Sequence, residues 1–214
     1  NQLGTTLYTL PKNKYLEFTD WSKTVTPPFV IYADFEAILP KDTRYFQRHL
    51  PISAGMLFIN NFTGVKIYKS FTGLDCVDQF LTEIEMIGKY IVTPYYYKNY
   101  QKKMIITDEQ QLMFENKTSC YLCNKPLVSP VRDHDHFTGL YLGAACTTCN
   151  LSRQIRHTLP VVFHNLKGYD LHHILKFGLS KYHSWNISCI PLTSEKFLSL
   201  FARIDSLTVK FIDS

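Results

Sequence analysis

Apolar and polar positions follow two different periods along the chain. Phe29-Val-Ile-Tyr-Ala33 is a short run of β-branched and aromatic residues, a composition typical of a buried strand. Between Asp75 and Ile91 the apolar residues recur every three or four positions, which predicts an amphipathic helix with Asp75 as its N-cap. The first half of the chain is therefore expected to contain both strand and helix.

The same patterns place the remaining elements. Asn60-Asn-Phe-Thr-Gly64 is a turn signal that joins two strands into a hairpin. Further strands are expected near residues 52–60, 64–69, 159–163, 186–191, 196–203 and 207–212. Short helices are expected near residues 108–115 and 151–156, and another opens within residues 164–170. The alternation of strands and helices around one insert predicts an α/β or α+β domain, with helices flanking a mixed sheet.

Changes in composition divide the chain into four segments. Residues 1–28 are polar and end at Pro27-Pro28, so we expect an extended lead-in. Residues 29–106 are expected to form the first part of the sheet domain, residues 107–157 an inserted module, and residues 158–214 the second part. The chain begins without Met and ends in mid-pattern, so we expect a piece of a longer protein.

The composition indicates a folded chain with an anionic partner. The 214 residues are 45% hydrophobic and 19% charged, which suits a buried core and is unlike a disordered chain. The net charge of +5 and the pI of 8.8 favour nucleic acid as the partner. No apolar run approaches the roughly 20 residues that span a bilayer. We expect a soluble, intracellular protein without a membrane partner, in the nucleus or the cytoplasm.

Four of the six cysteines form two Cys-x2-Cys pairs, Cys120 with Cys123 and Cys146 with Cys149. Each pair can form a tight turn that presents two thiolates, and four thiolates satisfy one tetrahedral Zn²⁺. The spacing therefore predicts a structural zinc site rather than a disulfide framework. The alternative is two pairs of free thiols.

Asp133-His-Asp-His136 lies between the two cysteine pairs, and Asn150 directly follows the second pair. Carboxylate and amide oxygens are ligands that Mg²⁺ or Mn²⁺ would choose. A nearby imidazole can take a proton from water while the cation neutralises charge on a phosphate. Alternatively, the histidines cap loops or ligate zinc, although four cysteines already fill a tetrahedral site.

This stretch resembles the endonuclease VII branch of the HNH, or His-Me finger, nucleases. The likeness rests on the cysteine pairs, the Asp-His-Asp-His segment, a Gly before the second pair and the Asn after it. It implies a zinc-containing ββα-metal module that hydrolyses DNA. By this resemblance, zinc is held by Cys120, Cys123, Cys146 and Cys149, magnesium is held by Asp133 and Asn150, His134 is the general base, and His136 supports the scissile phosphate.

One position departs from the pattern of that family. The family usually has Arg before the Gly that precedes the second cysteine pair, and this chain has Leu142 before Gly143. The departure removes one expected phosphate contact. A zinc-stapled element that grips DNA without cutting it is therefore an alternative to an active nuclease.

A second set of carboxylates flanks the module. Asp34-Phe-Glu36 is expected at the end of a strand, where alternate side chains share a face and can share a metal ion. Asp170 adds a third carboxylate at a strand-to-helix junction, a usual place for functional groups in an open sheet. The three together make two-metal phosphodiester hydrolysis plausible, whereas Asp-x-Glu alone also fits an exposed strand end.

These segments resemble the first two exonuclease motifs of family B DNA polymerases. Tyr32-Ala-Asp-Phe-Glu36 is similar to motif I, and His164-Asn-Leu-Lys-Gly-Tyr-Asp170 is similar to motif II. The resemblance implies an RNase H-like proofreading domain in which Asp34, Glu36 and Asp170 are catalytic metal ligands and Asn165 and Tyr169 contact a single-stranded 3′ end. An endonuclease VII-like insert between these motifs is similar to the protein-primed polymerases of Maverick or Polinton elements and related viruses.

Basic and aromatic residues supply further candidate DNA contacts. Arg153 and Arg156 lie in the short basic helix, and Lys167 lies within motif II. Residues 95–103 interleave tyrosines with lysines and can stack on single-stranded bases. The alternative is a linker whose rings pack against the core.

The combined patterns predict the amino-terminal part of a protein-primed family B DNA polymerase that acts in DNA replication. Motif III, Tyr-x3-Asp, and the polymerase palm motifs are absent from the sequence, so the exonuclease part is expected to end before motif III. The expected partners are single-stranded or branched DNA, the remainder of the polymerase chain and a terminal protein. One alternative is a stand-alone Mg²⁺-dependent HNH endonuclease acting on branched or nicked DNA, and another is a non-catalytic zinc-containing DNA-binding module.

Overall fold

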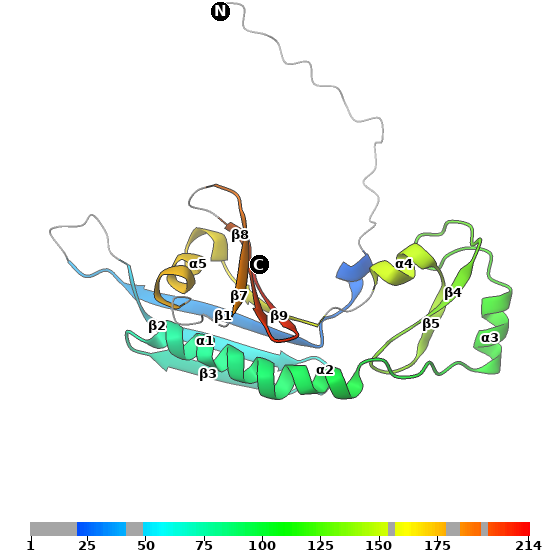
Figure 1. Ribbon diagram of the computed structural model, residues 1–214, viewed down its shortest axis with the longest axis horizontal. Coiled ribbons are helices and arrows are strands. Elements are labelled where there is room, and N and C mark those ends of the chain that lie inside the picture. The colour runs from blue at the N-terminus through cyan, green and yellow to red at the C-terminus, as the bar shows by residue number, and fades with distance from the viewer. Residues whose placement is uncertain (1–20, 42–48, 154–156, 179–184, 194–196) are drawn as a thin grey trace, which may run out of the picture.

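The computed structural model describes residues 21–41, 49–153, 157–178, 185–193 and 197–214. Within these ranges, a seven-stranded sheet has the order β3-β2-β1-β6-β9-β8-β7, and β4 and β5 form a separate two-stranded sheet (Figure 1). The strands are β1 (Phe29–Ile38), β2 (Leu50–Asn60), β3 (Lys66–Thr72), β4 (Pro130–His134), β5 (Tyr141–Cys146), β6 (Thr158–Phe163), β7 (Asn186–Pro191), β8 (Phe197–Ile204) and β9 (Leu207–Asp213).

Helical segments cover and connect these sheets. The α-helices are α1 (Cys76–Ile87), α2 (Thr93–Asn99), α3 (Asp108–Glu115), α4 (Thr147–Ser152) and α5 (Asp170–His173). The 3-10 segments are η1 (Trp21–Thr24) and η3 (Leu166–Gly168), and the π-helical segments are η2 (Gly88–Val92) and η4 (Ile174–Gly178). No helix among the described residues is long and apolar enough to cross a membrane.

The large sheet is mixed. β1 pairs with β2, and β2 with β3, in antiparallel fashion, whereas β6 runs parallel to both β1 and β9. β8 then pairs antiparallel with both β9 and β7. The expected fold class, an α+β domain with helices flanking a mixed sheet, is confirmed, and the RNase H-like identity of the sheet stays a prediction.

β1 is longer than its apolar run predicts. Its first three residues are buried, and from Ile31 to Glu36 buried and exposed residues alternate strictly. Because β2 pairs with β1 beyond the apolar run, the strand continues to Ile38. Asp34 and Glu36 therefore lie within the strand, on its exposed face, and the prediction that they mark its end is wrong.

α1 confirms the helix predicted from the apolar period. Its buried residues include Phe80, whose ring centroid lies 5.1 Å from that of Phe35 in β1 and 5.9 Å from that of Phe163 in β6. Burying such a ring contributes on the order of 2 kcal/mol, so this contact fixes the helix on one face of the sheet. Asp75 occupies the N-cap position, but its side chain makes no capping hydrogen bond.

The aromatic and basic run is partly helical. Its first residues form α2, which continues α1 and η2 without a break. Tyr96 is 1% exposed, and Tyr95 packs edge-on against Phe29 with ring centroids 5.0 Å apart. These rings pack against the core, as the linker alternative predicted, whereas Tyr97 is 70% exposed.

The inserted module lies beyond the end of α2, where α3, the β4–β5 hairpin and α4 are grouped together (Figure 1). α3 has the predicted bounds because Thr107 and Gln110 cap its first turn reciprocally. α4 begins at Thr147, earlier than predicted, because the second cysteine pair lies at its first turn. α4 ends at Ser152, and residues 154–156 of the predicted helix lie outside the described ranges.

The described part of the lead-in is not wholly extended. Trp21–Thr24 forms the 3-10 segment η1, and Trp21 packs against the cluster that contains Cys120 and Cys149. In Figure 1 this segment lies beside α4 before the chain enters β1. The lead-in therefore contacts the inserted module as well as leading into the sheet.

Candidate functional site

Four sulfur atoms converge at the base of the inserted module. The Sγ atoms of Cys120, Cys123, Cys146 and Cys149 all lie within 4.8 Å of one another. Those of Cys123 and Cys146 are 4.0 Å apart, and a tetrahedral zinc with bonds of about 2.3 Å places its sulfur ligands about 3.8 Å apart. The four cysteines therefore fit a zinc ion.

Backbone N–H groups favour the thiolate form of one cysteine in this cluster, Cys120. Burial raises the pKa of the Cys120 thiol, but backbone N–H groups of Cys123 and Cys146 outweigh it and lower that pKa to about 7. Burial and the neighbouring thiols raise the pKa of Cys149. Crowded thiols shift in this way without a cation between them, and a bound divalent ion would deprotonate them.

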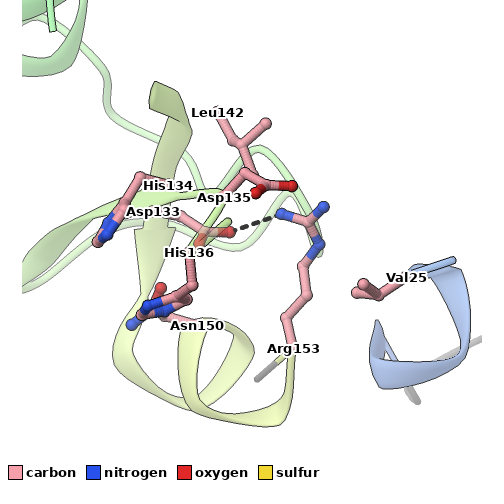
Figure 2. Close-up of a pocket in the computed structure, with 8 residues that line it drawn as sticks. All are labelled: Val25, Asp133, His134, Asp135, His136, Leu142, Asn150 and Arg153. Atoms are coloured by element: carbon pink, nitrogen blue, oxygen red, sulfur yellow. Dashed lines mark hydrogen bonds and ion pairs between the residues drawn. The ribbon is translucent and has the colours of Figure 1, made fainter. Parts of the chain in front are cut away.

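The predicted nuclease residues meet in one pocket (Figure 2). β4 supplies Asp133 and His134, the loop after it supplies His136, and α4 supplies Asn150. The pocket is lined by Val25, Asp133, His134, Asp135, His136, Leu142, Asn150 and Arg153. The structure thus brings together the predicted cation ligands Asp133 and Asn150, the predicted base His134, and His136, which was predicted to support the phosphate.

Asp133 is the buried carboxylate of this pocket, with 5% of its surface exposed. Its Oδ2 accepts hydrogen bonds from the Tyr121 hydroxyl at 2.5 Å and from the Arg153 guanidinium at 2.9 Å. Arg153 also donates to the Tyr121 hydroxyl at 2.7 Å. The guanidinium that the sequence suggested for DNA is therefore paired with Asp133 in this structure (Figure 2).

Asp135, the second aspartate of the Asp-His-Asp-His segment, bonds to the backbone of the turn that follows. Asp135 Oδ1 accepts hydrogen bonds from the backbone N–H groups of Phe137 and Thr138, both at 2.8 Å. The backbone N–H of Gly139, at a φ of 81°, bonds the Asp135 carbonyl at 2.7 Å. Asp135 therefore shapes the turn that separates the two histidines, which is a common use of Asp in loops.

The two histidines lie against each other, with ring centroids 4.6 Å apart. A shift in the β4–β5 register falls between Asp133 and His134. The ring of His136 stacks on Tyr100 at 5.2 Å, with an angle of 24° between the planes. Burial, and then the neighbouring His134, lower the pKa of His136. His136 is therefore a neutral, well-fixed imidazole near physiological pH.

Two tyrosines of this site were missed as functional candidates. Tyr121 lies between the first two cysteines, and a Cβ atom on Gly143 would lie 2.7 Å from its ring. Gly143 is therefore needed because the Tyr121 ring occupies that space. Tyr100 was visible only as one member of an aromatic run. The contact of Tyr121 with Asp133 had no sequence signal, because neither spacing nor periodicity links the two residues.

The second candidate site lies where the chain passes from β6 through η3 into α5, next to the neighbouring strand β1. Asp170, the first residue of α5, is 2% exposed, and the backbone N–H of Phe35 bonds its carboxylate. Burial, followed by the charges of Asp34 and Glu36, raises the pKa of Asp170 to about 7. Its Oδ1 has no hydrogen-bond partner among the described residues. An orphaned buried oxygen next to other carboxylates fits the chemistry of a cation ligand.

The three carboxylates are less tightly grouped than the cysteines. Among the described residues, the four cysteines are the group of possible ligands whose atoms all lie within 4.8 Å of one another. Asp34 and Glu36 remain on the exposed face of β1 while Asp170 is buried. The charges of Asp34 and Glu36 therefore act on Asp170, but the three carboxylates are not close enough together to form a compact group of metal ligands.

The motif II residues line the loop before Asp170. Asn165 is exposed and adopts a left-handed conformation with a φ of 58°. The Tyr169 hydroxyl bonds His49 Nδ1 at 2.8 Å, and Lys167 pairs with Asp213 at 3.2 Å. Asp213 also accepts the backbone N–H of Leu166 at 3.1 Å. His49 and Asp213 were missed because they come from distant strands or loops.

One predicted DNA contact, Arg156, lies outside the described residues. Arg153, three residues earlier, directly follows α4 and is described. The described arginine of the predicted pair, Arg153, contacts Asp133.

Comparison with known proteins supports the module. The family model described as recombination endonuclease VII matches residues 97–163. This range covers well under half of the 214 residues and extends past the predicted insert on both sides. No curated protein and no solved structure matches the chain, and the comparisons give no evidence for a polymerase or for a Maverick or Polinton element. The chain therefore contains an endonuclease VII-like domain, which implies a nuclease-type function on DNA.

Proposed function

We propose that the inserted module is a divalent-cation-dependent DNA nuclease of the HNH type. The observation that carries the proposal is the pocket in which Asp133, His134, His136 and Asn150 meet beside the cysteine cluster. All of these residues fall within the matched range. Mg²⁺ or Mn²⁺, when bound, would neutralise charge on the phosphate and on the leaving oxygen.

Each residue of the pocket has one role in this proposal. Asp133 and Asn150 offer oxygen ligands for the cation. His134 takes the proton of the attacking water as the new P–O bond forms and the bond to the leaving oxygen breaks. His136, fixed against Tyr100, donates a hydrogen bond to the scissile phosphate. The cysteines hold Zn²⁺, which keeps β4, β5 and α4 in place.

A second candidate function is 3′–5′ exonuclease activity at the carboxylates of the sheet. The observation that favours it is Asp170, a buried carboxyl with an orphaned oxygen and two acidic neighbours. We infer that Asp34, Glu36 and Asp170 would share cations, and that Asn165, Tyr169 and Lys167 would contact the single-stranded end. This activity would belong to the proofreading part of a protein-primed family B DNA polymerase acting in replication, with a terminal protein and the rest of that chain as partners.

The decisive experiment is cleavage of end-labelled single-stranded and branched DNA with Mg²⁺ or Mn²⁺. The protein is compared with His134→Ala and Asp34→Ala, each of which is the control for the other. Internal cuts that vanish only in His134→Ala support the HNH nuclease. Stepwise shortening from the 3′ end that vanishes only in Asp34→Ala supports the exonuclease.

A third outcome would refute both activities. If the protein binds DNA but leaves both substrates intact with either cation, the module is a non-catalytic DNA-binding element. The pairing of Arg153 with Asp133 and the presence of Leu142 would then mark a site that grips DNA without cutting it. Cuts that persist in both variants would show that the chemistry lies elsewhere.

A further inference from the structure

Tyr121 connects the cysteine cluster to the nuclease pocket. It lies in the turn between Cys120 and Cys123, where its neighbours in sequence are zinc-ligand candidates. Its hydroxyl reaches the pocket and donates to Asp133 Oδ2 at 2.5 Å. One side chain therefore touches both the element that would hold zinc and the carboxylate that would hold the nuclease cation.

The tyrosine ring is held in place on several sides. Its backbone N–H donates to the carbonyl of Ala144 at 3.0 Å, which ties the turn to β5. The ring packs so closely over Gly143 that a Cβ atom there would overlap it. With the backbone and the ring both fixed, the hydroxyl is held as a donor to Asp133 Oδ2.

Arg153 completes the arrangement from the second cysteine pair. Its backbone N–H donates to the Cys149 carbonyl at 3.1 Å, so it lies one turn after a zinc-ligand candidate. Its guanidinium donates both to the Tyr121 hydroxyl and to Asp133 Oδ2. Of the two donors to Asp133, Tyr121 thus lies within the first cysteine pair and Arg153 lies shortly after the second.

The two oxygens of Asp133 differ as a result. Oδ2 receives both donors, whereas no described residue donates a hydrogen bond to Oδ1. Carboxylates that ligate a metal through one oxygen are commonly held by hydrogen bonds to the other. Such a bond fixes the direction of the ligating oxygen, and its loss typically weakens metal binding without removing a ligand.

We propose that Tyr121 is a positioning residue that orients Asp133 for the nuclease cation through its hydroxyl. The inference rests on the proposed role of Asp133 as a cation ligand. A purely structural role would require the ring over Gly143 but not the hydroxyl, and phenylalanine would satisfy it. The zinc-binding turn and the cation site therefore share one residue, and the first controls the geometry of the second.

The test is a titration of Mn²⁺ followed by electron paramagnetic resonance. All proteins carry Asp34→Ala, so that the carboxylates of the sheet contribute less binding. Tyr121→Phe keeps the ring and removes only the hydroxyl, and we expect its Mn²⁺ affinity to fall by about 10- to 100-fold. The matched control is Tyr68→Phe, because Tyr68 is 70% exposed on β3, away from the pocket. The control should bind as the parent does.

Zinc content and thermal unfolding separate positioning from folding. An unchanged zinc content with weakened Mn²⁺ binding supports the proposal. Unchanged Mn²⁺ affinity in Tyr121→Phe overturns it, whether or not the unfolding temperature falls, because the hydroxyl would then not orient the cation ligand. If Tyr121→Phe loses zinc, the Mn²⁺ affinities of this variant and the parent are compared with saturating zinc added. Weakened Mn²⁺ binding then still supports the proposal, and unchanged binding still overturns it.

Asp133→Asn distinguishes this inference from the proposed function. If Asp133→Asn binds Mn²⁺ as the parent does, the cation does not use Asp133, and the proposed function fails together with the inference. If Asp133→Asn loses binding while Tyr121→Phe retains it, the cation site stands and only the positioning role of Tyr121 is refuted.

Discussion

The two carboxylate sites of this molecule are assembled in opposite ways. In the pocket that also contains His134 and His136, Asp133 already receives two hydrogen bonds, from Tyr121 and Arg153. At the sheet, Asp170 has an oxygen without a hydrogen bond from the described residues and two acidic neighbours. The first carboxylate has two hydrogen-bond donors from the protein, whereas burial and two acidic neighbours disfavour the ionised form of the second.

The difference follows from where the ligands lie in the sequence. The HNH residues and the cysteines occupy one short segment, residues 120–153, so a local zinc cluster can fix their positions. The sheet site joins β1 to the start of α5 across more than a hundred residues, and only strand pairing brings them together. Loss of zinc should therefore affect the first site and spare the second.

The largest expected effect is loss of the zinc cluster. Cys149→Ser replaces a thiolate ligand, and a structural zinc site contributes on the order of 10 kcal/mol to the folding of small domains. We expect loss of bound zinc, fast hydrogen exchange in β4 and β5, and no endonuclease activity. Zinc content and hydrogen exchange by mass spectrometry measure the change.

Cys189→Ser is the matched control, because Cys189 is exposed and lies outside the cluster. The sheet should keep its exchange protection in both variants. If the amides of β1 and β6 lose protection in Cys149→Ser as well, the two regions are not independent. The expectation that zinc loss spares the sheet site would then be wrong.

The next effect is chemical. His134→Ala should lower the rate of internal DNA cleavage by about 10²- to 10⁴-fold, the usual contribution of a general base. Folding and zinc content should be unchanged, because the His134 ring is only half-buried. Single-turnover cleavage of branched DNA measures the rate. Retention of the parental rate would remove His134 from the mechanism.

The sheet site predicts a dependence of stability on pH. The folded state raises the pKa of Asp170 from 3.8 to about 7, so the folded protein holds a proton that the unfolded chain releases. Stability from this group should therefore be highest below about pH 4, fall between about pH 4 and about pH 7 by roughly 4 kcal/mol in total, and level off at higher pH. Urea unfolding without divalent cations at pH 5 and pH 8 measures the difference.

Asp170→Asn should flatten that dependence, because the amide does not ionise. Mg²⁺ should also reduce it in the parent protein, since a cation between the carboxylates favours the ionised form. If the urea midpoint changes with pH by the same amount in the parent protein and in Asp170→Asn, other groups cause the change. The contrast between the two sites would then lose its electrostatic basis.

The sequence predicted which residues meet at the pocket better than it predicted what holds them. Asp133, His134, His136 and Asn150 come from one short segment, and the structure brings them into one pocket, while their roles as ligands and base stay predictions. The roles of Tyr121 and Arg153 depend on contacts between three separate elements, which periodicity does not encode.

The same limit applies to the sheet. The apolar run predicted that β1 exists but not that it continues through Asp34 and Glu36, because partner strand β2 supplies the pairing there. The structure also shows Asp213 at the loop before Asp170, a contact between residues 47 positions apart. Helix bounds set by local capping, as at Thr107, were predicted correctly for that reason.

The smallest expected effect concerns Lys167 at the rim of the sheet site. Its ion pair with Asp213 is half-exposed at the lysine, and exposed pairs contribute about 0–1 kcal/mol. Lys167→Ala should therefore leave the urea midpoint nearly unchanged, whereas Asp213→Ala, which also removes the bond to the Leu166 N–H, should lower it more. If Lys167 contacts DNA, its loss weakens binding of single-stranded DNA, and the salt dependence of that binding becomes shallower. Unchanged affinity and salt dependence would assign Lys167 to the ion pair alone, and the sheet site would then depend on Asn165 and Tyr169 to hold a strand end.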